Sequence, residues 1–489
     1  MKTSLFAHPQ QDIVAGVVVF LVALPLCLGI AIASGVPPIS GLIAGIVGGL
    51  VVPLISRAPL SVSGPAAGLA SVVAAEVGEV GLNAFLTAVV LAGAIQVGLG
   101  WFRAGRYSAL VPSSVIKGML AAIGITIILK QIPVALGASG SITHALEGFH
   151  PGALAIAAVS LGILLSWPYT PMAKITWLPS ALVVVVVGTA MGLAFGDGAL
   201  GLQASHLVSV PSEGPAHLWS VLPHPDPEAL LHENTWMVAM TVAAVASIET
   251  LLSLQAVDRL DPLHRKSPPD TELMAQGVGN MVSGLLGGIP MTSVIVRSGA
   301  NAAAGGRTRL SAMVHGVLLL VAVLLLAPLL GYVPLACLAA VLIHIGFKLA
   351  RPALFVEQYR LGFDQLAPFG ITIAAILIED LLVGVIIGVL VGIAFVLRQH
   401  ARGVVALTME NGEITVRLRR DGTFVAKPAI QAALEQVPDD ARVVFDATGE
   451  YVDHDVKELV AEFSIDAARR GVEVETRGFD LSAVGAGGH

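Results

Sequence analysis

Long apolar runs recur along the first four hundred residues of this chain, and they restrict its fold more than any other feature. Residues 13–33, 84–100 and 236–254 form three such runs, and their lengths approach the ~20 residues that a helix needs to cross a ~30 Å hydrocarbon layer. Since 55% of the 489 residues are hydrophobic and only 12% are charged, about half the charged fraction of a soluble protein, we predict a mainly α-helical, polytopic membrane protein.

The basic residues alternate along this pattern. When the spans are taken in order as fourteen, the connections after even-numbered spans contain Lys or Arg, as at Arg103, Arg106 and Arg307, and the other connections contain almost none. The longest connection after an odd-numbered span, residues 196–234, has five acidic residues, four histidines and no Lys or Arg. Because basic connections stay in the cytoplasm, both termini are expected on the cytoplasmic side of a bacterial inner membrane.

Two of the expected spans, the third and the tenth, are short and interrupted by Gly, Pro, Ser and Thr. Residues 61–68 read Ser-Val-Ser-Gly-Pro-Ala-Ala-Gly, and residues 287–298 read Gly-Gly-Ile-Pro-Met-Thr-Ser-Val-Ile-Val-Arg-Ser, about 229 positions later. The first and eighth spans begin about 224 positions apart, so the interruptions occupy corresponding places in two halves. Seven spans per half is an odd number, which predicts two inverted repeats of seven segments.

Transporters built from inverted repeats hold their substrate near the midplane, where broken helices direct half-helix N-termini at an anion. Gly and Pro break the helix and free backbone N–H groups, and Ser63, Thr292 and Ser293 add hydroxyl donors. The alternative is that these small residues only allow helices to pack closely. Paired interruptions at corresponding positions favour a binding site for a small anion.

Glu249 lies near the middle of the eighth span, where a charge costs ~2.5 to 3.5 kcal/mol and persists mainly with a partner or a task. Ser253, four residues later, lies on the same helical face. The pair suits a proton carrier or one side of a Na⁺ site. Arg297, which follows the tenth-span interruption, is expected to hold the anion or to neutralise Glu249. The alternative is a structural Glu–Arg pair that braces two helices.

Other classes of function lack support. Residues 1–400 carry 17 Lys+Arg against 18 Asp+Glu, and residues 401–489 carry 10 against 16, so no nucleic-acid partner is expected. Cys27 and Cys337 lie in apolar runs, and the histidines of residues 196–234 are irregularly spaced, so no metal site is predicted. No nucleotide loop, zinc-hydrolase helix or Ser/His/Asp arrangement occurs, which argues against an enzyme and a cofactor other than a bound Na⁺.

Six separated motifs along the first four hundred residues resemble the SulP anion permeases, the solute carrier 26 family. They are Ala23-Leu-Pro25, Ala33-Ser-Gly-Val-Pro-Pro38, Ser63-Gly-Pro65, Ser247-Ile-Glu249, Ala275-Gln-Gly-Val-Gly-Asn280, and Gly287-Gly-Ile-Pro290 leading into Arg297-Ser298. The resemblance implies fourteen membrane segments, divided into a mobile core and a gate, with the anion between the broken third and tenth segments and facing the first and eighth.

Carried over to this chain, the resemblance points to Pro25, Ser63, Gly64, Glu249, Pro290, Met291, Thr292, Ser293 and Arg297. We expect Glu249 to couple an ion together with Ser253, because the two lie on one helical face, and the other residues to bind the substrate. Many family members have Gln directly after the first-segment proline, where this chain has Leu26. One polar substrate contact is therefore missing from the expected set. This difference makes a larger or more polar oxyanion less favoured.

Residues 401–489 are predicted to form a separate soluble domain, because the apolar runs stop and charged, alternating sequence begins. Strands are expected at 412–419, 441–446 and 472–476, and helices at 427–436 and 455–470. This order resembles a small STAS domain, the module usual at the end of SulP proteins. The loop before the last helix has no serine for a phosphoswitch, and Asp453 or Asp455 is expected to cap that helix.

We therefore predict a secondary active transporter of small inorganic anions, with bicarbonate slightly ahead of sulfate, coupled to Na⁺ or H⁺ by an elevator-type mechanism. The order of substrates follows from Leu26 and from a similarity of Thr292–Arg297 and the short tail to the carbonic-anhydrase-associated branch of the family. The resemblance also implies a homodimer. The alternative is an uncoupled anion exchanger or channel of the same family.

Overall fold

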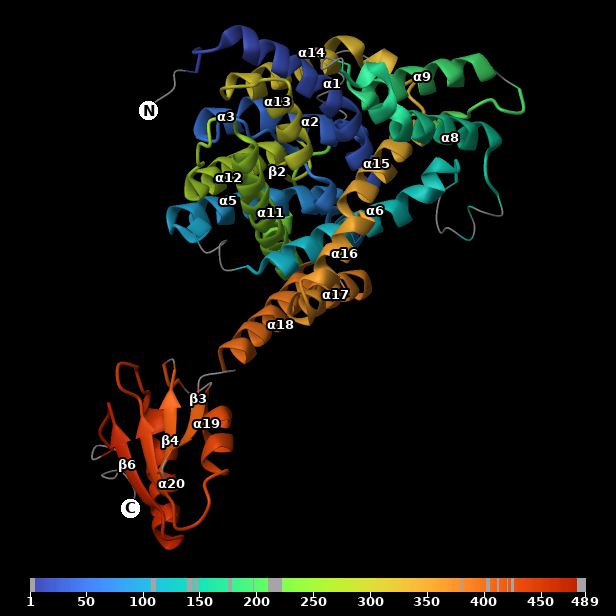
Figure 1. Cartoon of the computed structure of the whole chain (residues 1–489). Helices are drawn as coiled ribbons and strands as arrows, with labels where there is room; N and C mark the ends of the chain where they lie inside the picture. The colour runs from blue at the N-terminus through green and yellow to red at the C-terminus, as the bar shows by residue number, and fades with distance from the viewer. Residues whose placement is uncertain are drawn as a thin grey trace. The chain divides into compact units, whose positions relative to one another are not determined.

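The computed structural model of the chain is mainly helical (Figure 1). It describes residues 5–106, 111–138, 143, 145, 148–174, 178–196, 198–209, 222–379, 381–401, 405–410, 413–419, 421–423 and 426–481. Part of the long connection at 196–234, namely residues 197 and 210–221, lies outside this description, as does residue 412 of the first expected strand in the tail. The chain divides into two compact units, Met1–Gly388 and Val389–His489, and helix α18 runs through the boundary.

The first unit holds the apolar helices. Among the described residues, seven helices are long and apolar enough to cross a membrane, and four shorter apolar helices accompany them. The first half contains α1 (Pro9–Ala33), α2 (Pro38–Leu50), α3 (Val52–Ile55), β1 (Ser63–Pro65), the 3₁₀ turn η1 (Ala67–Leu69), α4 (Ala70–Val80), α5 (Leu82–Trp101), α6 (Ser113–Ala135), α8 (Pro151–Ser166) and α9 (Ser180–Phe195).

The second half repeats this order. It contains α11 (Glu233–Leu260), α12 (Pro269–Leu285), β2 (Met291–Ser293), α13 (Ile295–Ala303), α14 (Leu310–Leu330), α15 (Leu335–Leu349), α16 (Pro352–Arg360), α17 (Phe363–Ile378) and α18 (Leu381–Ala401). The third and tenth expected segments are each broken into a short strand followed by a half-helix, β1 with α4 and β2 with α13. The breaks fall at the interruptions in the sequence.

Helix contacts occur in pairs that exchange when the two halves are exchanged. Helix α5 packs against α11 and α12, and its counterpart α14 packs against α1 and α2. Likewise α6 packs against α17, and its counterpart α15 packs against α8. Strands β1 and β2 pair antiparallel, so these equivalent segments run in opposite directions. Both observations fit the predicted inverted repeats.

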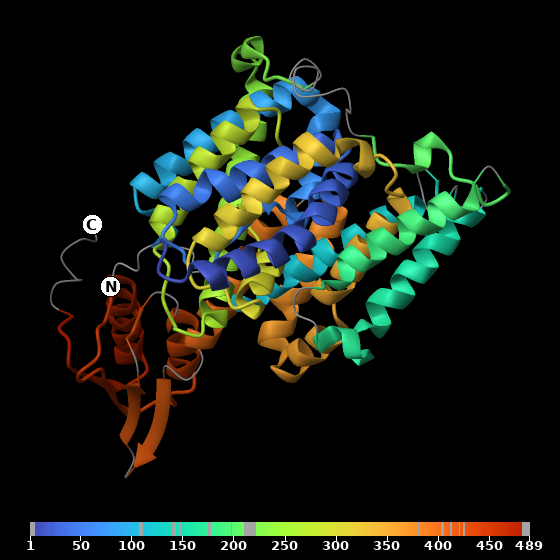
Figure 2. The ribbon, with the colours of Figure 1, turned by 90° about the horizontal axis from the view of Figure 1, so that it is seen from above.

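The same contacts separate the helices into two bundles. Helices α1, α2, α5, α11, α12, α13 and α14 pack mainly on one another, and α6, α8, α9, α15 and α17 form a second group. Figure 2 shows α1 (blue) beside α14 (yellow), and the green helices α8 and α9 side by side in the other group. This division corresponds to the core and gate that the resemblance implied, with β1 and β2 inside the core bundle.

The second unit contains a four-stranded sheet with the order β3-β4-β5-β6 and two helices. Its elements are β3 (Val405–Glu410), β4 (Glu413–Leu418), α19 (Lys427–Leu434), β5 (Arg442–Asp446), α20 (His454–Arg469) and β6 (Glu473–Arg477). Strand β3 pairs antiparallel with β4, and the other pairs are parallel. The strands and helices expected from the sequence lie within two residues of these bounds at each end, but β3 was not predicted.

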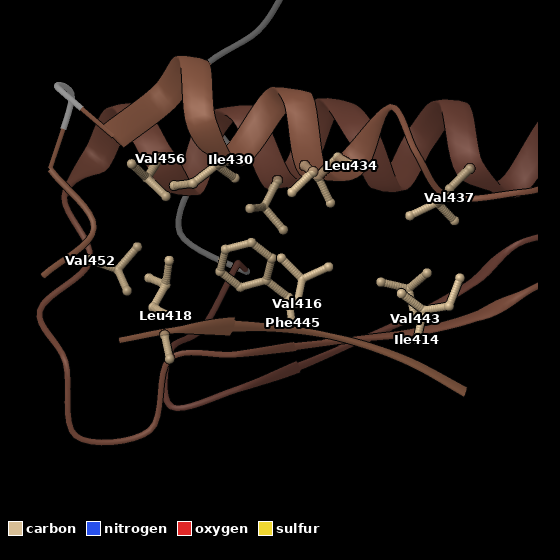
Figure 3. Close-up of a cluster of buried hydrophobic side chains, with 14 of the residues drawn as sticks. Ile414, Val416, Leu418, Ile430, Leu434, Val437, Val443, Phe445, Val452 and Val456 are labelled. Atoms are coloured by element: carbon tan, nitrogen blue, oxygen red, sulfur yellow. The ribbon is translucent and has the colours of Figure 1, made fainter. Parts of the chain in front are cut away.

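An apolar core joins the sheet to its helices. Side chains of α19 such as Ile430 and Leu434 face Val416 and Phe445 of the sheet (Figure 3). Helix α20 begins at a side-chain cap, since the Asp453 carboxylate accepts a hydrogen bond of 2.9 Å from the backbone N–H of Val456. Of the two predicted caps, Asp453 is therefore the one used. The unit has a buried core of its own.

Candidate functional site

Strands β1 and β2 meet at the centre of the core bundle. Ser63 lies opposite Ser293, Gly64 opposite Thr292, and Pro65 opposite Met291. All of these residues are buried. Gly and Pro end the helical pattern on both segments, and the freed backbone groups pair with each other across the two halves. The structure thus brings together residues that are more than two hundred positions apart in the sequence.

Hydrogen bonds from neighbouring side chains complete this junction. The Ser61 and Ser293 hydroxyls lie 2.7 Å apart, and the Ser298 hydroxyl accepts a bond of 2.9 Å from the Val62 backbone N–H. The Val294 N–H donates to the Val62 carbonyl at 3.0 Å. Since a buried polar group without a partner is costly, these bonds fix the backbone of both broken segments.

One face of α12 supports the junction, and its role was not predicted from the sequence. Asn280 exchanges two hydrogen bonds with the Met291 backbone, at 2.7 and 3.1 Å. Gln276 donates to the Ser63 hydroxyl and, at 3.0 Å, to Glu272, which also accepts from Ser56. Glu272, Gln276 and Asn280 recur every four residues, a polar stripe in an expected membrane span. That four-residue spacing is the feature of the sequence that could have identified this supporting face.

A cavity of about 240 Å³ lies between the core bundle and the gate bundle. Core residues on its wall come from η1, α11 and the start of α13, and gate residues come from α6 and α15. Of the predicted site residues, only Glu249 and Ser253 line it. The others are buried and form no part of this wall: Pro25, Ser63, Gly64, Pro290, Met291, Thr292, Ser293 and Arg297.

Glu249 is the acidic residue on the cavity wall. Its carboxylate lies against η1, where a Cβ added to Gly68 would come within 2.8 Å of the Oε1 atom. The Oε2 atom is buried without a hydrogen-bond partner among the described residues. Ser253, one turn further along α11, borders the same cavity. A carboxylate oxygen without a protein partner can accept a proton or ligate Na⁺.

Arg297 is completely buried and does not line the cavity. Its Nη2 donates to the Pro65 carbonyl at 3.2 Å, and a Cβ added to Gly64 would overlap its Nη1. The Nε and Nη1 atoms have no hydrogen-bond partner among the described residues. Cys27 of α1 and His315 of α14 lie near enough to feel its charge.

Arg297 was expected either to hold the anion or to neutralise Glu249, and the second of these alternatives is wrong. No ion pair joins these two side chains in the described part of the chain. The reason is the direction of the side chains at the start of α13. Residues 294–296 line the cavity, whereas the Arg297 side chain points toward β1. The structural-pair alternative therefore fails as well. A guanidinium in this position places positive charge behind the paired strands.

Two cations stand at one end of the cavity wall. Lys117 begins the second turn of α6, and Arg259 is near the end of α11. Lys117 forms an ion pair of 2.8 Å with Glu357 of α16, a partly exposed pair of modest strength. Among the described residues no cluster of three or more His, Cys, Asp or Glu could hold a metal ion.

Comparisons with known proteins identify the family and the fold of the first unit. A family model described as the Sulfate permease family matches residues 10–365. The chain is 29% identical to a putative sulfate transporter, YvdB, of Bacillus subtilis (strain 168), over 87% of this chain and 80% of that protein. The solved transmembrane domain of a cyanobacterium bicarbonate transporter, BicA, matches with a TM-score of 0.67 at 26% identity, covering 78% of this chain and 98% of that one.

A third similarity extends over both units. The structure of murine solute carrier 26 family member A9, an anion transporter in the inward-facing state, matches with a TM-score of 0.78 over 100% of this chain and 89% of that one. At 16% identity, this likeness concerns the fold alone.

Proposed function

The chain belongs to the sulfate permease family, and we propose from this premise that it is a secondary active transporter of a small inorganic anion, coupled to Na⁺ or H⁺. It is a multi-pass integral membrane protein, and the family members that it matches are transporters and not enzymes, as the sequence predicted. Bicarbonate is the favoured substrate and sulfate the second. The relatives' names, a putative sulfate transporter and a bicarbonate transporter, support this substrate class.

The observation that carries the proposal is Glu249, an acid on the wall of the cavity with one oxygen that has no hydrogen-bond partner among the described residues. Moving an uncompensated carboxylate across the bilayer would carry net charge through hydrocarbon, at ~2.5 to 3.5 kcal/mol or more. With a cation and an anion both bound, that cost falls. Coupling then has a physical cause, because the loaded core moves more easily than the half-loaded one.

The two bundles support an elevator-type movement. The core bundle holds β1, β2 and Glu249, and the gate bundle supplies α6 and α15 to the opposite wall of the cavity. A rigid displacement of the core against these two helices would carry the site from one side of the membrane to the other. In this account Arg297 acts on the anion through its charge, from behind the paired strands.

The mostly apolar cavity wall supports the proposal of a singly charged anion. Apart from Lys117, Arg259, Glu249, Gln255 and two serines, the residues that line it are apolar. Leu26, where many relatives have Gln, is buried in α1. Because transfer of charge to apolar surroundings becomes more costly as the charge increases, the apolar part of this wall supports the proposed preference for bicarbonate over the divalent sulfate ion. A bound Na⁺ would use Glu249 and Ser253.

Further parts of the proposal follow from the sequence. We propose that both termini lie on the cytoplasmic side of a bacterial inner membrane, and the alternation of basic connections supports this orientation. The tail is proposed to be a STAS-like domain, supported by its sheet order and by the helix that follows β5. A homodimer and a functional association with carbonic anhydrase are proposed from the family resemblance.

The test is uptake into proteoliposomes. Labelled bicarbonate and labelled sulfate are supplied separately, and an inward Na⁺ gradient and an inward proton gradient are imposed one at a time. We expect saturable uptake that one of the two gradients accelerates, with bicarbonate taken up more efficiently. Uptake that neither gradient changes would support the uncoupled exchanger or channel instead. Faster sulfate than bicarbonate uptake would reverse the order of substrates.

A further inference from the structure

Helix α6 borders two cavities, one after the other along its length. Ile116 and Lys117 line the 240 Å³ cavity near the N-terminal end of the helix, and Ile123 lines its far end. A second cavity of about 10 Å³ begins at Ile123 and continues past Thr126 to Lys130. Ile116, Ile123 and Lys130 are seven residues apart, so they lie on one face of α6 and span ~21 Å of the helix axis.

Two glycines on other faces of α6 pack against helices of the gate bundle. Gly124 is so close to α15 that a Cβ there would overlap the Gly346 carbonyl, and a Cβ on Gly118 would lie 2.8 Å from the Phe369 carbonyl of α17. The face that carries Ile123 is therefore the one that the gate bundle presents to the core. It faces η1, the turn that also contacts Glu249.

A single layer of side chains separates the two cavities. Ala67 of η1 and Ile123 of α6 line both of them. The Ile123 side chain packs on η1, since a Cβ added to Gly68 would come within 3.0 Å of its Cδ1 atom. A volume of about 10 Å³ is near the minimum for one water molecule. The smaller cavity is thus too narrow for an anion in this conformation.

The walls of the smaller cavity are chemically suited to an anion. Ser71, Thr126 and Gln131 supply hydroxyl and amide donors, and Lys130 supplies a positive charge. Lys130 is an exposed residue on α6, whereas Ile123 is 5% exposed. A cation at the mouth of a cleft raises the local concentration of anions and their rate of entry. The large cavity has its own mouth cations, Lys117 and Arg259.

We propose that this face of α6 lines the anion path between two mouths, that the layer formed by Ala67 and Ile123 closes the path toward Lys130, and that Lys130 attracts the anion at that second mouth. The proposal rests on the proposed transport function. It adds the route of the anion along α6, and it assigns to Lys130 an effect on anion affinity from one side of the membrane only. Movement of η1 with the core would remove Ala67 from Ile123. The smaller cavity would then open while the larger one closes.

The first experiment maps which side of the membrane reaches each cavity. Both native cysteines, Cys27 and Cys337, are buried. They should not react with an aqueous thiol reagent, so single cysteines can be introduced into the wild-type sequence. Leu120→Cys probes the large cavity and Thr126→Cys the small one. Leu129→Cys is the matched control, because it is an exposed apolar residue of α6 outside both cavities. A membrane-impermeant thiosulfonate is applied to each side of oriented proteoliposomes.

We expect Leu120→Cys to react from one side and Thr126→Cys from the other, while Leu129→Cys stays unreactive in lipid. Reaction of Thr126→Cys from the Leu120 side, or from neither side, would overturn the proposed route. This readout needs no transport measurement. Failure of the transport proposal, seen as no uptake by the wild-type protein, is therefore distinguishable from failure of the route.

The second experiment measures Lys130→Gln against wild type and Lys130→Arg. With labelled bicarbonate or sulfate supplied on the side that reaches Thr126→Cys, we expect Lys130→Gln to raise KM about tenfold at low ionic strength and to leave kcat unchanged. Lys130→Arg should restore KM, and the increase should shrink in high salt. When the anion is supplied on the other side, KM should not change. Equal KM for Lys130→Gln and wild type on both sides would exclude Lys130 from the path.

Discussion

The two inverted repeats share a backbone arrangement but contribute different chemistry to the site. From the first repeat come Gly64 and Gly68, which have no side chain to occupy the junction. From the second come Arg297, which fills the space beside Gly64, and Glu249, whose carboxylate lies against Gly68. At these two contacts the first half therefore supplies space for a side chain, and the second half supplies the charged side chain that fills it.

The comparison shows how a symmetric fold can hold an asymmetric substrate and ion. Antiparallel pairing of β1 with β2 fixes the two broken segments equally. The charged side chains are not duplicated between the two repeats. The residue opposite Gly64 in the strand register is Thr292, and the Arg297 guanidinium donates to a backbone carbonyl of β1, the first repeat's strand. Because each charged side chain lies against a glycine of the other half, changing either member of a pair should disturb the same contact.

The largest effect is expected from Gly64→Ala. The new methyl group would overlap the Arg297 guanidinium, which is enclosed on all sides and has little room to move. Overpacking of this kind typically costs about 1 to 3 kcal/mol and distorts the surrounding backbone. We expect transport to be lost and the thermal unfolding temperature to fall. Uptake and thermal unfolding of the purified protein are the measurements.

A control and a rescue sharpen this first prediction. Gly78→Ala adds a methyl group where nothing lies within 4 Å, so it should leave both uptake and stability intact. Combining Gly64→Ala with Arg297→Gln shortens the side chain that would be overlapped, and the pair should be more stable than Gly64→Ala alone. An unaltered Gly64→Ala protein would mean that the space beside Arg297 is not limiting.

A smaller effect is expected from Arg297→Gln alone, which removes one charge and keeps a polar group. Apparent anion affinity should weaken by ~1 to 3 kcal/mol, because an anion beside β1 and β2 loses the positive charge behind it. Binding to purified protein in detergent is the measurement. Arg309→Gln, which changes an arginine bonded to the carbonyls of Pro53 and Ser56, is the matched control. Full anion affinity in a folded, inserted Arg297→Gln protein would show that Arg297 does not contribute to anion binding.

The smallest effect is expected from Gln276→Ala, which breaks a link between the halves. Gln276 on α12 donates to the Ser63 hydroxyl of β1, and a net hydrogen bond contributes about 0.5 to 1.5 kcal/mol. We expect a rise in KM of a few fold with the fold retained. Gln431→Ala on the exposed face of α19 is the control and should change nothing. A KM identical to wild type would show that Ser63 keeps its position without this bond.

Much of the architecture followed from the sequence. Apolar length and the alternation of basic connections predicted the helical segments, and Gly and Pro marked the two breaks, because these residues act on the backbone locally. In the tail, strand β3 was missed although Val405, Leu407 and Met409 alternate toward one face, as a short edge strand does. Local pattern thus reached the elements and most of their bounds.

The site itself was only partly accessible to sequence reasoning. Glu249 and Ser253 were correctly expected on one helical face, and they share the cavity wall. The direction of the Arg297 side chain was not predicted, because it depends on how α13 turns after β2 and on the space that Gly64 leaves in the other half. Contacts between residues more than two hundred positions apart are set by tertiary packing, which cannot be read from a single sequence.

The central claim is that Glu249 links the driving ion to the anion, and Glu249→Gln tests it most directly. Glutamine keeps the size and hydrogen bonding of the side chain but cannot change charge. Uptake of labelled anion into proteoliposomes is measured with and without the cation gradient that accelerates the wild-type protein, with Glu475→Gln on β6 of the second unit as a carboxylate control. We predict that Glu249→Gln still exchanges anion but gains nothing from the gradient. If it concentrates anion as wild type does under the same gradient, Glu249 is not the coupling residue.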